Sequence, residues 1–414
     1  MYDLLERRRA LLQRAAIEKE GGGDNDGKYI IYRGSTSTTV NPITGSVDYG
    51  VSYKNIPVAS MSGSIRGNVA LDCNGILFSC PNTQERHRYY IPPDYTGSGT
   101  IHFKSGSVDL YNTKITGMNT SSIFLSSNGR SFLWVGRCSS GSMYCRMYKG
   151  SFFAGASPND KKASLTGVSA SITLMYDPEV NSSNAWPINN TGTNGHNSGF
   201  YINADRDNLK YAIVGSDNQG NRTGFSPSTA SFTSNGGKTW IPIQDLLYGS
   251  QSGQTPNQFR ASSFSNNGKY CGIVYNNKFW ISTNSCSNFS QKTVPGVIDF
   301  YNICCSQNWG VMYVVGRFMS ASISRFGIWR STDKGTNWER VFDGYYSGSY
   351  AFYPKIMCND KGDKLIRVDV SGSVNRPLYY SHDYGTTWVS SGKSAYGPGV
   401  SRIDFDMCRD SFNI

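Results

Sequence analysis

The chain has 414 residues and a net charge of +11, with 17% charged residues, 45 glycines and 27 tyrosines. Ordinary soluble proteins carry about a quarter charged residues, so the Lys- and Glu-rich surface of helical bundles and coiled coils is missing here. Aromatic residues make up 13% of the chain, which is enough to bury a core and argues against intrinsic disorder. The composition therefore predicts many short strands joined by tight turns.

The distribution of apolar and basic residues limits the kinds of partner. No stretch approaches the roughly 18 consecutive apolar residues of a membrane helix, and the N-terminus lacks the basic-then-apolar order of a signal peptide. Basic residues are scattered over the body, with Lys161-Lys162 as the densest pair. The sequence therefore predicts no membrane insertion and no nucleic-acid partner. The excess positive charge is attributed first to a mildly basic, solvated surface. Attraction to an acidic neighbour or polyanionic glycan is the alternative.

The cysteines and histidines predict neither a metal nor a cofactor. There are ten cysteines, no Cys-x-x-Cys pair, and four histidines, none within metal-ligand spacing of another. Several cysteines recur in similar local phrases, such as Cys304-Cys305 and Met357-Cys358. Free buried thiols are therefore favoured over disulfides, which predicts synthesis in a reducing cytoplasm.

The first predicted element is an amphipathic helix over residues 1–20. From Asp3 to Lys19 the chain contains no Gly, Pro or Val and is filled with good helix formers. The stripe-forming apolar residues include Leu4, Leu5, Leu11 and Leu12. Residues 21–27, Gly-Gly-Gly-Asp-Asn-Asp-Gly, predict a flexible link. Because a lone helix of this length is marginal in water, we expect its apolar stripe to have a partner. Docking on the body is the alternative to an intermolecular anchor.

The remaining body, residues 28–414, contains a repeated eight-residue phrase. Three copies stand out, at 233–240, 331–338 and 381–388, and a worn fourth copy at 282–289 keeps the spacing of 49 to 50 residues. The positions that define the phrase are Thr233, Asn235, Gly237, Thr239, Trp240, Ser331, Asp333, Gly335, Trp338, Ser381, Asp383, Gly385, Thr387 and Trp388.

The residue types in this phrase predict a structural turn. An Asp or Asn after a strand can accept hydrogen bonds from turn amides. The Gly permits a positive φ, and the final aromatic residue packs on a neighbouring repeat. The phrase resembles the Asp-box, Ser-x-Asp-x-Gly-x-Thr-Trp, of sialidase-like β-propellers. That resemblance implies an all-β propeller in which the phrase lies between the outer strands of a blade, away from the ligand-binding face.

A second phrase extends the count of repeats. Ser265-Asn266-Asn267-Gly268-Lys269 recurs in worn form, for example at Asn359–Asp363 and Asp205–Asn208. The last unit begins at Ile403 and is unfinished, whereas Tyr29-Ile30-Ile31-Tyr32 can complete it, which would remove exposed sheet edges. The sequence therefore predicts about seven blades, with six as the alternative, in a propeller closed by its terminal strands.

The resemblance also raises an enzyme hypothesis. Sialidase chemistry needs an Arg cluster, a Tyr nucleophile activated by Glu, and an Asp acid/base. Tyr32-Arg33 keeps part of the family's entry motif but lacks the Ile-Pro that follows it there. The body has only three glutamates, Glu85, Glu179 and Glu339, of which Glu179 is the most plausible candidate. A sialidase-like glycoside hydrolase is therefore the alternative to a protein without catalysis.

The N-terminal phrase Asp-Leu-Leu-Glu-Arg-Arg-Arg-Ala-Leu-Leu is similar to the openings of virion proteins in crAss-like bacteriophages. There the resemblance implies that a short helix docks the protein into the particle while the distal domain faces outward. We therefore expect a non-enzymatic virion protein of the tail, collar or fibre apparatus, in a multi-copy assembly. Its helix would bind other virion proteins, and its propeller another virion protein or a host surface glycan.

Overall fold

The computed structural model of the chain describes its strands and many of the turns between them. The predicted helix over residues 1–20 lies outside the described residues, as do residues 21–25 of the predicted link. The described residues are 26–28, 30–35, 43–46, 48–51, 53–56, 69–71, 76–79, 87–90, 106–107, 118–126, 131–138, 145–152, 170–176, 199–217, 230–249, 259–345, 355–368, 377–394 and 402–407.

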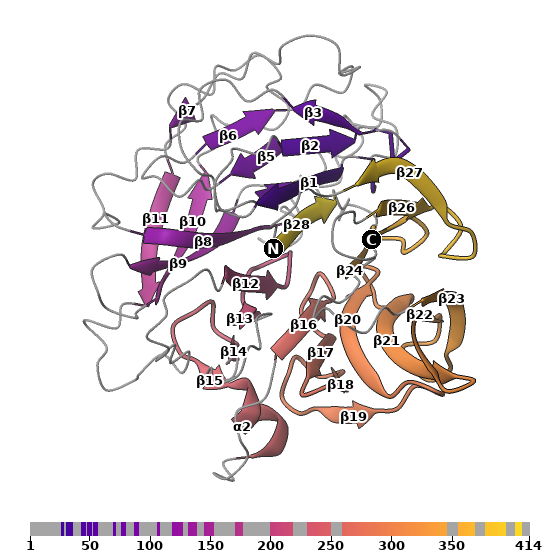
Figure 1. Cartoon of the computed structure of the whole chain (residues 1–414). Coiled ribbons are helices and arrows are strands. Elements are labelled where there is room, and N and C mark those ends of the chain that lie inside the picture. The colour runs from indigo at the N-terminus through magenta and orange to yellow at the C-terminus, as the bar shows by residue number, and fades with distance from the viewer. Residues whose placement is uncertain are drawn as a thin grey trace, which may run out of the picture.

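Within these ranges the strands form seven antiparallel sheets of four strands each, arranged in a propeller-like ring (Figure 1). Apart from one sheet that also takes in the last strand, each sheet is built from consecutive strands, as turns of a few residues favour. The strands of the first three sheets along the chain are β1 (Ile30–Ser35), β2 (Ile43–Ser46), β3 (Lys54–Ile56); β4 (Val69–Leu71), β5 (Ile76–Ser79), β6 (His87–Tyr90), β7 (Gly106–Ser107); and β8 (Met118–Leu125), β9 (Ser131–Cys138), β10 (Cys145–Phe152), β11 (Ala170–Tyr176).

The second half of the chain supplies the other four sheets and one short helix, α2 (Ile243–Tyr248). Their strands are β12 (Gly199–Ala204), β13 (Ala212–Asp217), β14 (Ala230–Thr233), β15 (Ile241–Pro242); β16 (Phe259–Phe264), β17 (Cys271–Tyr275), β18 (Lys278–Ser282), β19 (Ser290–Lys292); β20 (Asp299–Cys305), β21 (Met312–Ser320), β22 (Ile323–Ser331), β23 (Glu339–Tyr345); and β24 (Lys355–Cys358), β25 (Leu365–Val368), β26 (Pro377–Ser381), β27 (Val389–Ser394). No described helix is long and apolar enough to cross a membrane.

The two ends of the described chain meet in one sheet. The last strand, β28 (Arg402–Met407), runs antiparallel to β1, from the pair Ile30 and Met407 to the pair Ser35 and Arg402. The strand order in this sheet is β28-β1-β2-β3. The strand expected near Tyr32 and the unfinished unit that begins at Ile403 therefore lie side by side.

The last two residues of the segment predicted as a flexible link belong to the folded body. The Asp26 side chain is buried, and its Oδ1 accepts the amide of Asp360 at 2.9 Å. Its Oδ2 accepts the amide of Lys361 at 3.0 Å and the Asn359 Nδ2 at 2.9 Å. Gly27 follows with a φ of +79°. The carboxylate thus satisfies donors of the turn between β24 and β25.

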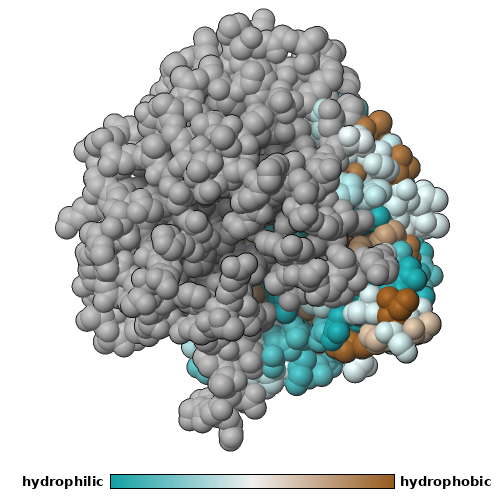
Figure 2. Space-filling model, viewed as in Figure 1, coloured by the Kyte–Doolittle hydropathy of each residue, from teal (hydrophilic) through white to brown (hydrophobic). Residues whose placement is uncertain are grey.

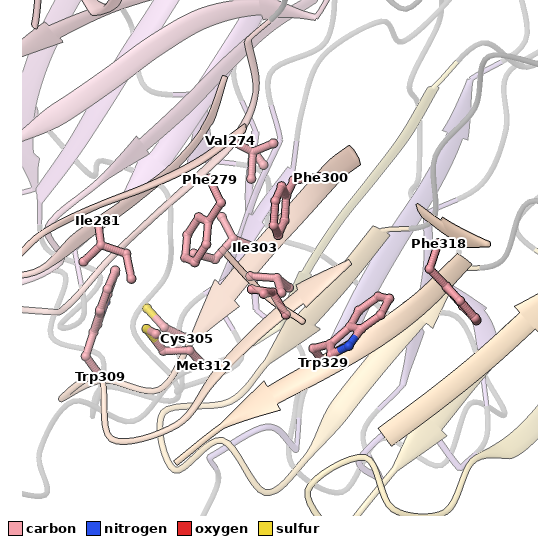
Figure 3. Packing of buried hydrophobic residues seen from close by; sticks show 13 residues of the cluster. Val274, Phe279, Ile281, Phe300, Ile303, Cys305, Trp309, Met312, Phe318 and Trp329 are labelled. Atoms are coloured by element: carbon pink, nitrogen blue, oxygen red, sulfur yellow. The ribbon is translucent and has the colours of Figure 1, made fainter. Parts of the chain in front are cut away.

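Neighbouring sheets pack face to face through large apolar side chains (Figure 3). The core between the β16–β19 and β20–β23 sheets contains Val274, Phe279, Ile303, Trp309 and Trp329, all buried. All five residues of β17 are buried, as expected for a strand covered on both faces. Burying a side chain of this size stabilises the fold by about 1.5–3 kcal/mol.

The cysteines whose side chains are described lie in these cores as free thiols. They are Cys271, Cys286, Cys304, Cys305 and Cys358, all buried. Burial raises the pKa of the Cys271 thiol. These residues therefore pack as small apolar groups.

Candidate functional site

The two repeated phrases lie at the same end of the sheets. The second phrase joins the first and second strands of a sheet, as between β16 and β17, and the Asp-box-like phrase joins the third and fourth, as between β22 and β23. Because the strands alternate in direction, both turns come at one end. We call this end the turn face. The opposite end, with the β17–β18 and β21–β22 turns, is the hairpin face.

The copy that begins at Ser331 shows how the phrase works. The Ser331 hydroxyl donates to Asp333 Oδ1 at 2.9 Å and accepts the Gly335 amide at 2.8 Å. Asp333 Oδ1 also accepts the amides of Thr336 and Asn337, at 3.0 and 2.8 Å. Two side chains thus replace the backbone partners that the turn lacks.

The other three predicted copies repeat these bonds. In each, the first hydroxyl accepts the amide four residues later: Thr233 from Gly237 (2.9 Å), Ser282 from Cys286 (3.0 Å) and Ser381 from Gly385 (2.9 Å). In each, the Asx oxygen also accepts an amide four residues later: Asn235 from Thr239 (3.0 Å), Asn284 from Asn288 (3.2 Å) and Asp383 from Thr387 (2.9 Å).

The aromatic residue that ends each copy packs into the apolar core. Trp338 meets Phe279 edge-on, with ring centroids 5.9 Å apart, and Trp388 meets Phe342 in the same way at 6.1 Å. Trp240 packs against a cluster that includes Leu133, a residue of the preceding sheet. These contacts tie adjacent sheets together, since edge-to-face aromatic pairs add about 0.5–1.5 kcal/mol beyond their buried area.

The structure reveals a further copy that the sequence analysis missed. The Ser46 hydroxyl donates to Asp48 Oδ1 at 2.6 Å and accepts the Gly50 amide at 2.9 Å. Tyr49 and Gly50 have positive φ angles of 59° and 87°. Tyr53 occupies the position of the Trp and is buried. The pattern Ser-x-Asp-x-Gly followed by an aromatic residue was the available signal, but the copy lies outside the 49-to-50-residue register.

In the described turns between Asp207 and Asp360, the second phrase links neighbouring sheets by backbone bonds. Asp207 donates to the Asn266 carbonyl (3.0 Å), Asn266 to that of Gln307 (3.1 Å), and Gln307 to that of Asp360 (2.8 Å). The next donor in the series, Asp360, meets the Asp26 carboxylate instead of a carbonyl. Asp26 therefore ends a ladder that runs across four sheets on the turn face.

The carboxylates of the turns have pKa values shifted from those of free side chains. The amide of Asn337, followed by its side chain and Ser331, lowers the pKa of Asp333. Burial raises the pKa of Asp383, but hydrogen bonds from Thr387 and Ser381 outweigh it, so the pKa is lowered. In the second phrase, burial of Asp205 raises its pKa even though three backbone amides bond to the carboxylate. The two Asp-box-like carboxylates are thus held ionised, as hydrogen-bond acceptors.

The catalytic candidates do not come together in the described part of the chain. Glu339 begins β23 next to the Ser331 turn, and its carboxylate forms an ion pair with Arg330 on the adjacent strand. Glu85 and Glu179 lie outside the described residues, and Arg33 lies in β1 without a described side chain. Over the described ranges, no group of three His, Cys, Asp or Glu side chains could hold a metal ion. The described side chains of the turn face therefore fasten strands by hydrogen bonds.

No protein-family model matches the chain, and no curated protein matches it. Solved structures with a similar arrangement include a GH74 enzyme from Niastella koreensis, at 11% identity and a TM-score of 0.26, covering 86% of this chain and 68% of that one. A prolyl endopeptidase matches at 11% identity and a TM-score of 0.47, with 92% of this chain covered. An ancestral GH74 enzyme matches at 13% identity and a TM-score of 0.41, over 84% of this chain and 39% of that one. The chain spans about half the length of the prolyl endopeptidase. These likenesses concern the fold alone.

Proposed function

We propose that the protein is a non-enzymatic binding propeller of a bacteriophage virion, held in the particle by its N-terminal helix. In this proposal the seven sheets are the blades of a closed ring, and the five Ser/Thr-x-Asx turns are Asp-boxes that fasten them. The phage assignment rests on the resemblance of residues 3–12 to virion proteins. The ring would form part of a tail, collar or fibre and bind another virion protein or a host surface glycan.

The place where the chain enters the ring is the observation that carries this proposal. Asp26 lies on the turn face, bonded to the β24–β25 turn through Asn359, Asp360 and Lys361. The described chain therefore begins on this face. An anchor placed there would hold the turn face towards the particle and leave the hairpin face pointing outward, which suits a protein with separate attachment and recognition ends.

The test replaces apolar residues of the predicted helix. Leu4→Asp with Leu11→Asp puts two carboxylates on the apolar stripe, whereas Gln13→Asp with Arg14→Asp puts two on its polar side. We expect the first pair to abolish incorporation into particles, measured by immunoblot of purified virions, and the second pair to leave it near the wild-type level. Both pairs should keep the wild-type melting temperature of the body.

Equal incorporation of both pairs would contradict the anchor. A second assay separates binding from hydrolysis: the full chain is incubated with host glycans and the released sugar is measured. The proposal predicts no release. Release that Glu179→Gln stops would replace it with the glycoside hydrolase.

A further inference from the structure

The turn face carries exposed lysines on three neighbouring sheets. Lys210 and Lys269 come directly before Tyr211 and Tyr270, which precede the second strands of the β12–β15 and β16–β19 sheets. Lys334 holds the fourth position of the Asp-box-like turn in the β20–β23 sheet, where its φ is 59°. All three lysines are exposed. We call Lys210, Lys269 and Lys334 the lysine row.

Lys269 and Lys334 converge on the ring of Tyr270, although they belong to different sheets. Their Nζ atoms lie 5.5 and 5.3 Å from the ring centroid, and Lys334 Nζ is 3.5 Å from the Tyr270 hydroxyl oxygen. The ring itself stacks on the buried Trp309, with centroids 5.8 Å apart and an interplanar angle of 18°. A fixed ring therefore positions both ammonium groups, since a cation over an exposed aromatic face gains about 0.5–1 kcal/mol.

The ring of Tyr211 repeats this arrangement one sheet earlier. Lys210 Nζ lies 5.0 Å from its centroid. The ring packs against Gly268, the residue before Lys269, so closely that a Cβ on this glycine would be 2.3 Å from Tyr211 Cδ2. The lysine row is therefore continuous through side-chain packing across the three sheets.

The positive charge of the lysine row is not used within the described fold. Within the described ranges, none of the three ammonium groups lies within 4.0 Å of a carboxylate oxygen. By contrast, Lys364 of the next sheet lies 3.6 Å from Asp363. Figure 2 shows hydrophilic residues gathered over the β16–β19 sheet on the described part of the surface.

The turns around the lysine row have an excess of positive charge. Their basic residues are Arg206, Lys210, Lys238, Lys269 and Lys334, and their acidic residues are Asp205, Asp207 and Asp333. The carboxylates of Asp205 and Asp333 already accept turn amides. This end of the three sheets therefore attracts anions.

We infer that the lysine row binds acidic side chains on a neighbouring protein of the particle. A lysine ammonium is a compact point charge, and three of them on adjacent sheets match a surface that presents several Asp or Glu side chains. Carboxylates placed there would also relieve the repulsion between the charges of Lys269 and Lys334. This inference rests on the proposed function, because it gives the chemistry of the partner that the turn face meets.

The aromatic rings of the row favour a protein over an anionic glycan. Sugar rings bind by stacking on open aromatic faces. Tyr270 is covered by two lysines and stacks on Trp309, and Tyr211 is covered by Lys210 and stacks on Phe232, with ring centroids 6.4 Å apart. The groups that the row offers to a partner are therefore its ammonium groups.

The test measures binding of the full chain, by isothermal titration calorimetry at low salt, to a synthetic peptide of alternating Glu and Gly. A peptide with Gln in place of Glu and dextran sulfate are the comparison probes. Lys269→Gln with Lys334→Gln removes two charges from the row. Lys278→Gln with Lys292→Gln is the matched control, since it removes two charges from the β16–β19 sheet near its hairpin face, where these residues pair with Tyr275 and Phe279.

We expect the first pair to weaken binding of the Glu peptide about fivefold or more, and the control pair less than about twofold, because exposed charge pairs contribute about 0.2–1 kcal/mol each. The Gln peptide should bind about tenfold more weakly than the Glu peptide. Both variants should keep the wild-type melting temperature.

Equal effects of the two pairs, equal binding of the two peptides, or no binding of the Glu peptide would overturn the inference. Dextran sulfate that binds more tightly than the Glu peptide, and that Lys269→Gln with Lys334→Gln weakens, would assign the row to a glycan instead. Incorporation into particles is measured separately with the Leu4 and Leu11 substitutions. Failure of the lysine row therefore leaves the anchor standing, and failure of the anchor leaves the peptide result readable.

Discussion

At the fifth position of the Asp-box-like turn, the backbone takes a left-handed conformation in every described copy. Gly335 and Gly385 have φ angles of +84° and +82°, whereas Cys286 holds the same position at +63°. A Cβ on Gly335 would lie 2.8 Å from Met312 Cε and 3.0 Å from Ile281 Cδ1. The glycine therefore serves two needs, backbone freedom and close packing.

We predict that Gly335→Ala lowers the free energy of unfolding by about 2–3 kcal/mol, because left-handed strain costs about 1–2 kcal/mol and overpacking adds to it. Chemical denaturation measures this. Cys286→Ala is the control: its site already holds a Cβ, so we expect a loss of less than about 1 kcal/mol. If Cys286→Ala lost as much stability as Gly335→Ala, close packing and backbone strain at the glycine would not explain the difference between the two copies.

The carboxylates of the turns predict a pH dependence. The lowered folded-state pKa values of Asp333 and Asp383 mean that both stabilise the fold above the unfolded value of about 3.9. That contribution is lost as the pH falls through the folded-state values. Because Asn fills this position in two copies, Asp333→Asn with Asp383→Asn should be tolerated at pH 7. The variant should lose less stability than the wild type between pH 6 and pH 3 in thermal denaturation. Parallel losses would contradict this.

At the scale of single elements, much of the strand-and-turn pattern could be predicted. The phrases at 233–240, 282–289, 331–338 and 381–388 each join two strands, because their polar side chains supply bonds that local sequence alone can specify. The copy at Ser46 was missed because Tyr53 replaces the Trp and the long first half of the chain breaks the repeat register. In the structure the Ser46 copy joins β2 and β3, which are the third and fourth strands of their sheet because β28 supplies the first. Its position is therefore equivalent to that of the other copies.

The exposure of single strand residues was beyond prediction for a different reason. Met319 and Ile323 are about half exposed, whereas Phe318 beside Met319 is as apolar and is buried. Which strand residues a neighbouring sheet covers depends on the packing between sheets. A sequence pattern of period two cannot distinguish the covered part of a strand from the part that projects.

At the scale of the whole molecule, Asp26 joins the start of the chain to a turn more than 330 residues later. We predict that Asp26→Ala lowers the free energy of unfolding by about 2–3 kcal/mol, since it removes the acceptor for the amides of Asp360 and Lys361 and for the Asn359 side chain. Asp245→Ala, at an exposed site in α2, is the control and should change stability by less than about 0.5 kcal/mol. Equal effects in urea denaturation would show that the ladder across the turn face does not depend on Asp26.

The most direct test of the account is a cryo-electron microscopy map of virions that contain the protein, with the ring resolved well enough to tell its two faces apart. The account predicts that residues 1–20 are inserted into the particle, that the turn face with Asp26 points towards it, and that the hairpin face with Met319 and Ile323 points outward. A ring attached through the hairpin face, with the N-terminal segment free of particle contacts, would contradict it.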